Sequence, residues 1–288
     1  MFHYGDWCPP AMGYKDWMKR GKWTVSACLA HSSGIVSEIA GVLGETEEAE
    51  EYMKLSQETA RAYRNILMDE NCHIKGGDFQ TAFVLPLYYN MLSGNDKKKT
   101  AANLVNLIRD NNYNIKTGFP GTPYVLFALA DNGYLEDAYK MLLADTCPSW
   151  LYEVKAGATT MWERWDALRE DGSCNLGEDN GSGGMVSFNH YANGAVGDFF
   201  YRRILGIEAT EGGYKTFRIA PQPGGGLSWA KGNVNTPYGR IRVSWTIEND
   251  RFKLEIEVPA GTRCEIILPS GRKVTEGSGS YSYEELLG

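Results

Sequence analysis

The sequence lacks the features that would place it among nucleic-acid-binding, membrane or secreted proteins. Its formal net charge at pH 7 is −7 and it has no basic block, which argues against nucleic acid and anionic membrane surfaces as partners. No stretch approaches the ~18 consecutive apolar residues of a membrane-spanning helix. The N-terminus has neither the basic nor the apolar region of a signal peptide, so we expect the chain as written to be cytoplasmic.

Motifs for metals and cofactors are missing as well. The six cysteines are scattered without a C-x-x-C pair, which argues against a zinc site and provides no disulfide framework. The four histidines do not stand at metal-ligand spacing, and the H-E-x-x-H motif is absent. We therefore expect neither a metal nor a cofactor.

Aromatic residues, by contrast, are plentiful. The chain has 8 Trp and 17 Tyr, and 43% of its residues are hydrophobic. This composition is typical of an ordinary globular protein. The aromatic content suits carbohydrate binding, but it suits a large helical core equally well.

The hydrophobic pattern changes its period along the chain. Apolar residues recur at helical spacing over residues 24–43, 46–66, 78–91, 96–110, 124–130, 135–143 and 189–205. Gly44 is a natural stop for the first of these helices. Short β-like runs follow over 216–219, 239–248, 252–258 and 264–268. Residues 240–247 and 252–258 alternate polar and apolar residues as half-buried antiparallel strands do, and Asn249-Asp250 supplies a hairpin turn between them. We predict a helical domain over residues 1–210 and an antiparallel β domain over 211–288.

One stretch, Gly157 to Asp166, combines the residue types that sugar chemistry uses. It reads GATTMWERWD, so that Glu163 lies between two indoles, Trp162 and Trp165. Aromatic faces suit the C–H faces of a sugar ring, and a nearby carboxylate can take a proton from water in glycosidic bond hydrolysis. The alternative is a helix start with two core tryptophans and one surface glutamate. Composition alone leaves both interpretations open.

The order of several longer strings resembles a known family. They are PSWLY at 148–152, GATTMWERW at 157–165, SFNHYANGAVG at 187–197 and YKTFRIAP at 214–221, with GFPGTP at 118–123 and Gly5-Asp6-Trp7 upstream. Together they resemble the C-terminal half of the family-78 glycoside hydrolases, the bacterial α-L-rhamnosidases. The resemblance covers nearly the whole chain.

The resemblance implies a fold, an activity and site residues. It implies a mainly α protein with a β domain: an incomplete (α/α)6 toroid followed by an antiparallel β-sandwich. The implied activity is inverting hydrolysis of terminal α-L-rhamnosides, for which a general acid and a general base are needed on opposite faces of the sugar. Glu163 matches the general base and His190 a histidine that contacts the sugar. The other residues that we assign to the substrate site are Asp6, Trp7, Trp150, Trp162 and Trp165.

The chain also departs from the family pattern. The family's general acid lies in an Asp-x-Pro-x-Arg-Asp-Glu type of segment, and no such segment occurs here. We therefore expect a C-terminal fragment that is weak or inactive alone, with Asp6 or Asp166 as the candidate substitute acid.

The incomplete ring also predicts an assembly state, and two other functions are compatible with the sequence. An open ring would expose apolar surface, which predicts a homo-oligomer or a separate chain that supplies the missing half. A catalytically silent carbohydrate-binding or structural module is the alternative function. Another toroid enzyme, a lyase or a phosphorylase, is a third possibility.

Overall fold

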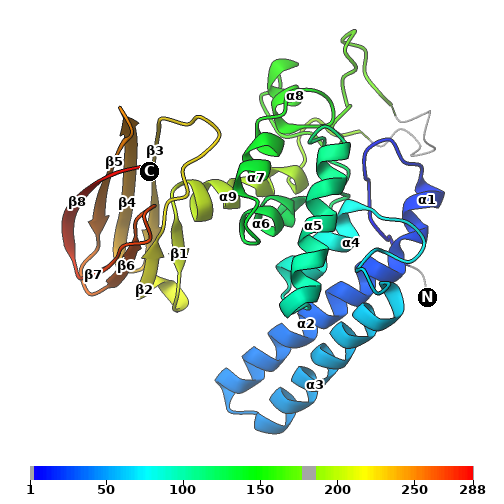
Figure 1. The fold of residues 1–288 in the computed structure, drawn as a ribbon, viewed down its shortest axis with the longest axis horizontal. Coiled ribbons are helices and arrows are strands. Elements are labelled where there is room, and N and C mark those ends of the chain that lie inside the picture. Colours follow the sequence, from blue (N-terminus) through cyan, green and yellow to red (C-terminus); the bar gives the residue numbers. More distant parts are fainter. Residues whose placement is uncertain (1–2, 177–185, 288) are drawn as a thin grey trace. The chain divides into compact units, whose positions relative to one another are not determined.

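Residues 3–176 and 186–287 are described by the computed structural model (Figure 1). The chain divides into two units, Met1–Ala195 and Val196–Gly288, and each is described below by itself. The first unit is helical and the second is mostly β-sheet, so the predicted fold class, a helical part followed by a β-sandwich, is confirmed.

Helices of very different lengths make up the first unit. They are α1 (Tyr14–Lys19), α2 (Gly21–Leu43), α3 (Thr46–Ala62), α4 (Gln80–Tyr88), α5 (Gly94–Asp110), α6 (Val125–Ala130), α7 (Leu135–Leu142) and α8 (Trp150–Lys155), with the short turns η1 (Tyr63–Leu67), η2 (Thr122–Tyr124) and η4 (Ala192–Ala195). The periodic pattern predicted α2 to α7. It missed α1 and α8, whose six residues mix polar and apolar side chains over less than two turns, whereas the equally short α6 is apolar throughout.

Helix α4 forms the centre of this unit. Every residue from Gln80 to Leu87 is buried, as expected of a helix that is apolar nearly all round. Pro86 lies within the helix. Tyr63 at the start of η1 donates its hydroxyl to the Ala82 carbonyl at 2.6 Å, which ties the end of the α2–α3 hairpin to this core.

Helix α2 packs against α3 with small residues and leaves its large ones outside. Figure 1 shows the two helices side by side as a hairpin, and Gly44, at φ 84°, ends α2 as predicted. Its buried positions include Ala27, Ala30, Ser33, Ser37 and Ala40. Its large apolar side chains are exposed instead: Val25, Leu29, Ile35, Val36, Ile39, Val42 and Leu43. Helix α2 is long and apolar enough to cross a membrane, but a core helix of a soluble protein can have the same length and composition.

The second unit begins within a helical run whose winding changes along its length. The helix predicted over 189–205 is present over 192–204 as η4 in the first unit and then α9 (Val196–Phe199) and the π-helical η5 (Phe200–Ile204), which follow one another without a gap. The prediction of a helix is therefore confirmed, but its change of winding was not predicted. The wider i→i+5 turn of η5 interrupts the α-helical ladder, as π-turns do. Gly206, at φ 78°, ends the segment.

Two four-stranded sheets follow. One has the order β1-β2-β6-β7 and comprises Ile207–Ala209, Thr216–Ile219, Arg263–Ile267 and Lys273–Glu276. The other has the order β3-β4-β5-β8 and comprises Trp229–Thr236, Gly239–Glu248, Arg251–Val258 and Gly279–Leu286. All pairs are antiparallel except β2 with β6. The predicted turn at Asn249-Asp250 joins β4 to β5, and both residues have the positive φ of a tight hairpin turn.

Trp245 is the largest side chain in the core of the sandwich. It is 1% exposed, and its indole Nε1 donates to the Ile204 carbonyl at 2.8 Å. Phe252 packs beside it with ring centroids 6.0 Å apart. Since Ile204 is the last residue of η5, this hydrogen bond fastens the end of that segment to β4.

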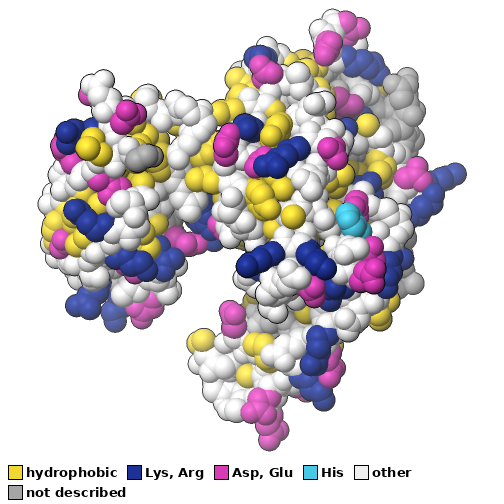
Figure 2. Space-filling view, in the orientation of Figure 1, with side chains coloured by type: hydrophobic (Ala, Val, Ile, Leu, Met, Phe, Trp, Pro, Cys, Tyr) yellow, Lys and Arg dark blue, Asp and Glu magenta, His cyan; other side chains and the backbone are white. Residues whose placement is uncertain are grey.

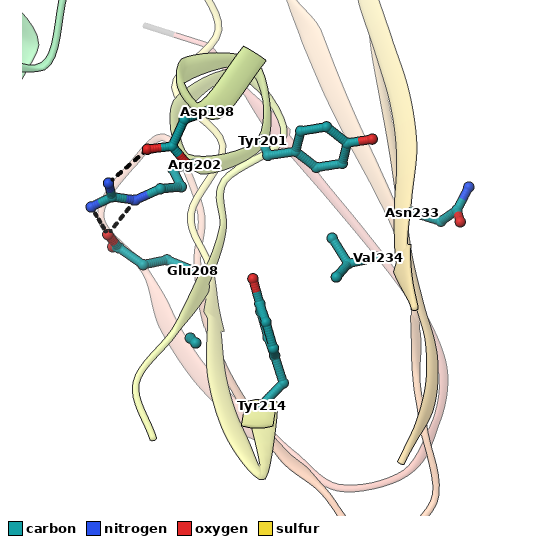
Figure 3. A pocket seen from close by; sticks show the side chains of 8 residues that line it. Asp198, Tyr201, Arg202, Glu208, Tyr214, Asn233 and Val234 are labelled. Atoms are coloured by element: carbon teal, nitrogen blue, oxygen red, sulfur yellow. Dashed lines mark hydrogen bonds and ion pairs between the residues drawn. The ribbon is translucent and has the colours of Figure 1, made fainter. Parts of the chain in front are cut away.

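An ion-pair network connects η5 and β1 at a cleft of about 530 Å³ (Figure 3). Arg202 donates to Asp198 Oδ2 at 3.0 Å and to Glu208 Oε1 at 2.6 Å. Burial alone would raise the pKa of Glu208, but the hydrogen bonds and charge of Arg202, with the charges of Arg203 and Arg218, hold it below its ordinary value. Tyr201 and Tyr214 line the same cleft. The network therefore stabilises the start of this unit.

Candidate functional site

Asp6 fastens the N-terminal loop to the loop that follows α5. Its side chain is fully buried, and Oδ1 accepts from Thr81 Oγ1 at 2.7 Å and from the Gly118 N–H at 3.0 Å. Arg20 donates to Oδ2 at 3.0 Å. Burial raises the pKa of Asp6, and the three donors act against that shift. Since the carboxylate has no exposed surface, its observed contacts are those of a loop anchor.

Trp7 and His190 are connected through Phe119. The Phe119 N–H donates to the Trp7 carbonyl at 2.8 Å, and the Phe119 ring lies 5.2 Å from the His190 ring. Trp7 is half-buried and meets Trp17 at 5.3 Å between ring centroids. His190 Nδ1 accepts the Ala192 N–H at 3.3 Å, so the neutral ring carries its proton on Nε2. That Nε2–H is a donor suited to a sugar hydroxyl.

Glu163 lies in an irregular segment between α8 and η4, not at a helix start. Its N–H donates to the Ser187 carbonyl at 2.9 Å, and its own carbonyl accepts from Asn193 Nδ2 at 3.4 Å. Two residues earlier in the chain, the Met161 carbonyl accepts the His190 N–H at 2.9 Å. The segment 187–193 therefore pairs with both sides of Glu163 and brings His190 beside it. The side chain of Glu163 is half-buried.

Trp150, Trp162 and Trp165 are buried around this segment. Their exposed fractions are 5%, 2% and 3%, so in this conformation they pack as core residues. Trp150 donates from Nε1 to the Asn193 carbonyl at 2.9 Å, and its ring meets Trp165 edge to face at 5.4 Å. These contacts support the backbone that carries Glu163. A direct contact of any of the three indoles with a sugar stays a prediction.

Arg164, Asp166 and Cys8 form the polar surroundings of Glu163. Arg164 pairs with Asp166 through Nε at 3.2 Å and Nη2 at 3.3 Å, and Asn175 donates to Asp166 Oδ2 at 2.8 Å. Burial raises the pKa of the Cys8 thiol to about 12; the charges of Glu163 and Asp166 act in the same direction and that of Arg164 opposes them. Cys8 is therefore a neutral thiol close to Glu163.

The space beside this cluster is small. A cavity of about 10 Å³ lies among Cys8, Pro9, Trp17, Arg164 and Trp165. That volume is room for about one water molecule and not for a sugar ring. Within the described ranges, no three His, Cys, Asp or Glu side chains come close enough together to hold a metal ion.

The structure thus joins residues that are far apart in the sequence. Asp6 and Trp7 meet the 118–119 loop, that loop meets His190, and the segment around His190 pairs with the backbone of Glu163. Sequence reasoning missed two buried polar residues that hold this segment, Glu153 and Asn193. Asn193 stands inside a string that carried the resemblance and Glu153 directly follows another, but the sequence offers no sign that a polar side chain points inward.

Comparison with known proteins identifies the family. Residues 1–204 match the model of the bacterial α-L-rhamnosidase 6 hairpin glycosidase domain, and residues 206–282 match that of the bacterial α-L-rhamnosidase C-terminal domain. The chain belongs to the bacterial α-L-rhamnosidase family. Both matches agree with the resemblance in the sequence.

Relatives and solved structures in this family are similar over most of the chain. An α-L-rhamnosidase from Formosa agariphila is 37% identical over 246 residues, 85% of this chain, and one from Streptomyces avermitilis is 35% identical over 91% of it. The crystal structure of the α-L-rhamnosidase from Aspergillus terreus superimposes with a TM-score of 0.92 at 34% identity over 99% of this chain. That of the Streptomyces avermitilis enzyme, complexed with L-rhamnose, gives a TM-score of 0.88 at 32% identity over 98% of this chain.

These relatives are much longer than the chain. It spans 26% of the Formosa agariphila protein and 25% of the Streptomyces avermitilis protein. Of the two crystal structures it covers 33% and 28%. The chain therefore corresponds to a small portion of a rhamnosidase.

Proposed function

We propose that this chain carries the general base and part of the sugar site of an inverting α-L-rhamnosidase, with Glu163 as the base. The observation that carries the proposal is the backbone network around Glu163. In a chain of the rhamnosidase family, this network pairs the backbone around Glu163 with the segment that carries His190, whose ring lies against Phe119 of the loop that bonds Trp7. The substrate class follows from the relatives, one of which is solved in complex with L-rhamnose.

In the proposed mechanism, Glu163 takes a proton from the water that attacks the anomeric carbon. His190 donates from Nε2 to a sugar hydroxyl and orients the ring. The leaving oxygen of a natural glycoside needs a proton of its own from a general acid. Asp6 is enclosed by three donors, and Asp166 is held by Arg164 and Asn175. Neither is free to supply that proton, so the isolated chain is weak or inactive on natural rhamnosides.

Two substrates with different leaving groups distinguish the role of the general base from that of the general acid. p-Nitrophenolate can leave without being protonated, whereas an alkoxide leaving group needs a proton from a general acid. We expect the isolated chain to release p-nitrophenol slowly from p-nitrophenyl α-L-rhamnoside and to leave an alkyl α-L-rhamnoside intact, since general acid catalysis contributes about 10²–10⁴-fold. Glu163→Gln should lower nitrophenol release by about the same factor, while Glu170→Gln, an exposed carboxylate of the same loop, should leave it unchanged.

Three results would contradict this assignment. Hydrolysis of the alkyl rhamnoside at the rate of a full-length relative would show that the acid is present. An unchanged rate in Glu163→Gln would exclude this residue as the base. No nitrophenol release at all, together with binding of L-rhamnose by calorimetry, would favour the catalytically silent carbohydrate-binding module.

We also propose that the exposed face of α2 is where a helical partner packs. Its large apolar residues Val25, Leu29, Val36, Ile39 and Leu43 recur at intervals of 4, 7, 3 and 4 residues and form one stripe along the helix, the "apolar stripe". This spacing is that of the seam between two packed helices. Exposed apolar surface of this extent usually marks an interaction site.

The family context supports the same partner. The matched domain is described as having six hairpins, and the chain spans about a quarter of its curated relatives. The partner that fits is therefore further helices of that domain. In a solution of this chain alone, a second copy takes that place. Figure 2 shows acidic and basic side chains interspersed over the visible face, without a large patch of one sign that would favour another kind of partner there.

A further inference from the structure

Glu153 is a buried carboxyl group beneath the segment that carries Glu163. It lies on α8 and is 2% exposed, and its Oε2 accepts the Trp162 N–H at 3.2 Å. Its Oε1 is buried and has no hydrogen-bond partner among the described residues. Trp162 itself belongs to a buried apolar cluster with Tyr152 and Ala167. A carboxyl group in such a place is poorly solvated, which favours its uncharged form.

Asn193 holds the next peptide unit, the one between Trp162 and Glu163. It is fully buried, and its Nδ2 donates to the Trp162 carbonyl at 3.1 Å and to the Glu163 carbonyl at 3.4 Å. The backbone carbonyl of Asn193 accepts the indole N–H of Trp150 at 2.9 Å. Between them, Glu153 and Asn193 bind the N–H and the carbonyl of Trp162, the residue directly before Glu163. These contacts fix the peptide planes on both sides of the Trp162 Cα, and the direction of the Glu163 side chain depends on the second of them.

We propose that Glu153 is a positioning residue that, as an uncharged carboxylic acid, fixes the Met161–Trp162 peptide while Asn193 fixes the following one, and so orients Glu163. The inference deepens the proposed function, since it matters for catalysis only if Glu163 is the base. Burial raises the pKa of Glu153 to about 8, against which the Trp162 N–H acts weakly. A titratable neighbour is the Cys147 thiol, whose pKa burial raises to about 11, so it stays neutral while Glu153 titrates.

The raised pKa gives the segment a pH dependence of known sign. When the segment opens, Glu153 meets water and its pKa returns toward its ordinary value near 4.5. Opening therefore releases a proton between pH 4.5 and about 8. Within that window a rise in pH favours the open form by up to about tenfold per pH unit. Below the window both forms are protonated, and above it both are ionised, so the dependence disappears.

Amide hydrogen exchange of the intact chain tests this inference. After correction for the intrinsic rate, we expect protection of the peptide covering 159–166 to fall with pH between 5.5 and 7.5, by up to about tenfold per unit. Glu153→Gln keeps an acceptor oxygen for Trp162 but cannot ionise, so its protection should not depend on pH. Glu153→Leu fills a similar volume without the acceptor, and its loop should exchange about tenfold faster at pH 6. Glu170→Gln is the exposed control and should retain the wild-type slope.

The outcomes separate a positioning role from simple packing. Protection in Glu153→Leu equal to that in Glu153→Gln would show that the side chain only fills space. A wild-type slope retained in Glu153→Gln would show that another group titrates. Either result would overturn the inference. Exchange does not measure turnover, so failure of the rhamnosidase assays would leave this test intact.

Discussion

Replacement of Arg20 by Met is expected to lower the free energy of unfolding by about 3–5 kcal/mol. Arg20 Nη1 lies 3.0 Å from Oδ2 of Asp6, whose side chain has no exposed surface. Removing one partner of a buried ion pair leaves the other charge buried without compensation, and that typically costs about 3–5 kcal/mol. The guanidinium also lies 4.4 Å from the centre of the Phe79 ring, a contact that Met does not replace. Urea denaturation followed by circular dichroism of the helices measures the loss.

The chain offers a matched control on the neighbouring helix. Lys19 and Asp16 form an ion pair at 2.7 Å whose side chains are 75% and 60% exposed. Because water solvates both charges, Lys19→Met should cost far less than Arg20→Met. Combining Arg20→Met with Asp6→Asn should recover much of the stability, since the orphaned charge is gone. Equal small losses for Arg20→Met and Lys19→Met would show that the Asp6 pair does not hold the loop.

The isolated chain is expected to self-associate at micromolar concentration through the apolar stripe of α2. Ile39, 53% exposed in the C-terminal half of that stripe, is the position to change. In Ile39→Glu a charge would have to enter an apolar interface, which should weaken association by roughly 100-fold or more. Light scattering coupled to size-exclusion chromatography reports the mass of each species. The variant should elute as a monomer at concentrations at which the unmodified chain does not.

A charge change on the same helix serves as the control. Glu38 is exposed but lies to the side of the apolar stripe, so Glu38→Lys should not change the oligomeric state. The helical content of both variants should stay that of the unmodified chain, because α2 meets α3 through its small buried residues and not through Ile39. A monodisperse monomer of the unmodified chain at micromolar concentration would contradict the proposed role of the apolar stripe.

Local signals in the sequence predicted much of the fold. The 3.6-residue period located α2 to α7, and strict alternation located β4 and β5 with the turn at Asn249-Asp250. Strands β1, β3, β7 and β8 were missed. Strand β3 contains Gly232 and two asparagines, which are poor strand formers, and its place in the sheet comes from pairing with β4 along its whole length. Pairing of this kind is not visible in the strand's own residues.

For the candidate site, too, the sequence showed some features and not others. Its strings were recognisable in the sequence, and the loops that carry them do meet in the structure. The supporting partners were not predictable, because they lie far away along the chain. The three residues that bind the Asp6 side chain are separated from it by 14, 75 and 112 positions along the chain. Such contacts depend on how helices pack, and no local period records which residues meet.

By itself, the sequence determined where helices give way to strands, which family the chain resembles and which glutamate stands between two indoles. Each of these follows from neighbouring residues, whose spacing sets the backbone period and the motif. Only the tertiary structure decided that those indoles are buried, that Glu153 and Asn193 hold the peptide before Glu163, and that α2 turns its large residues outward. Burial depends on which surfaces cover each other, and an apolar side chain has the same sequence signature whether or not it is covered.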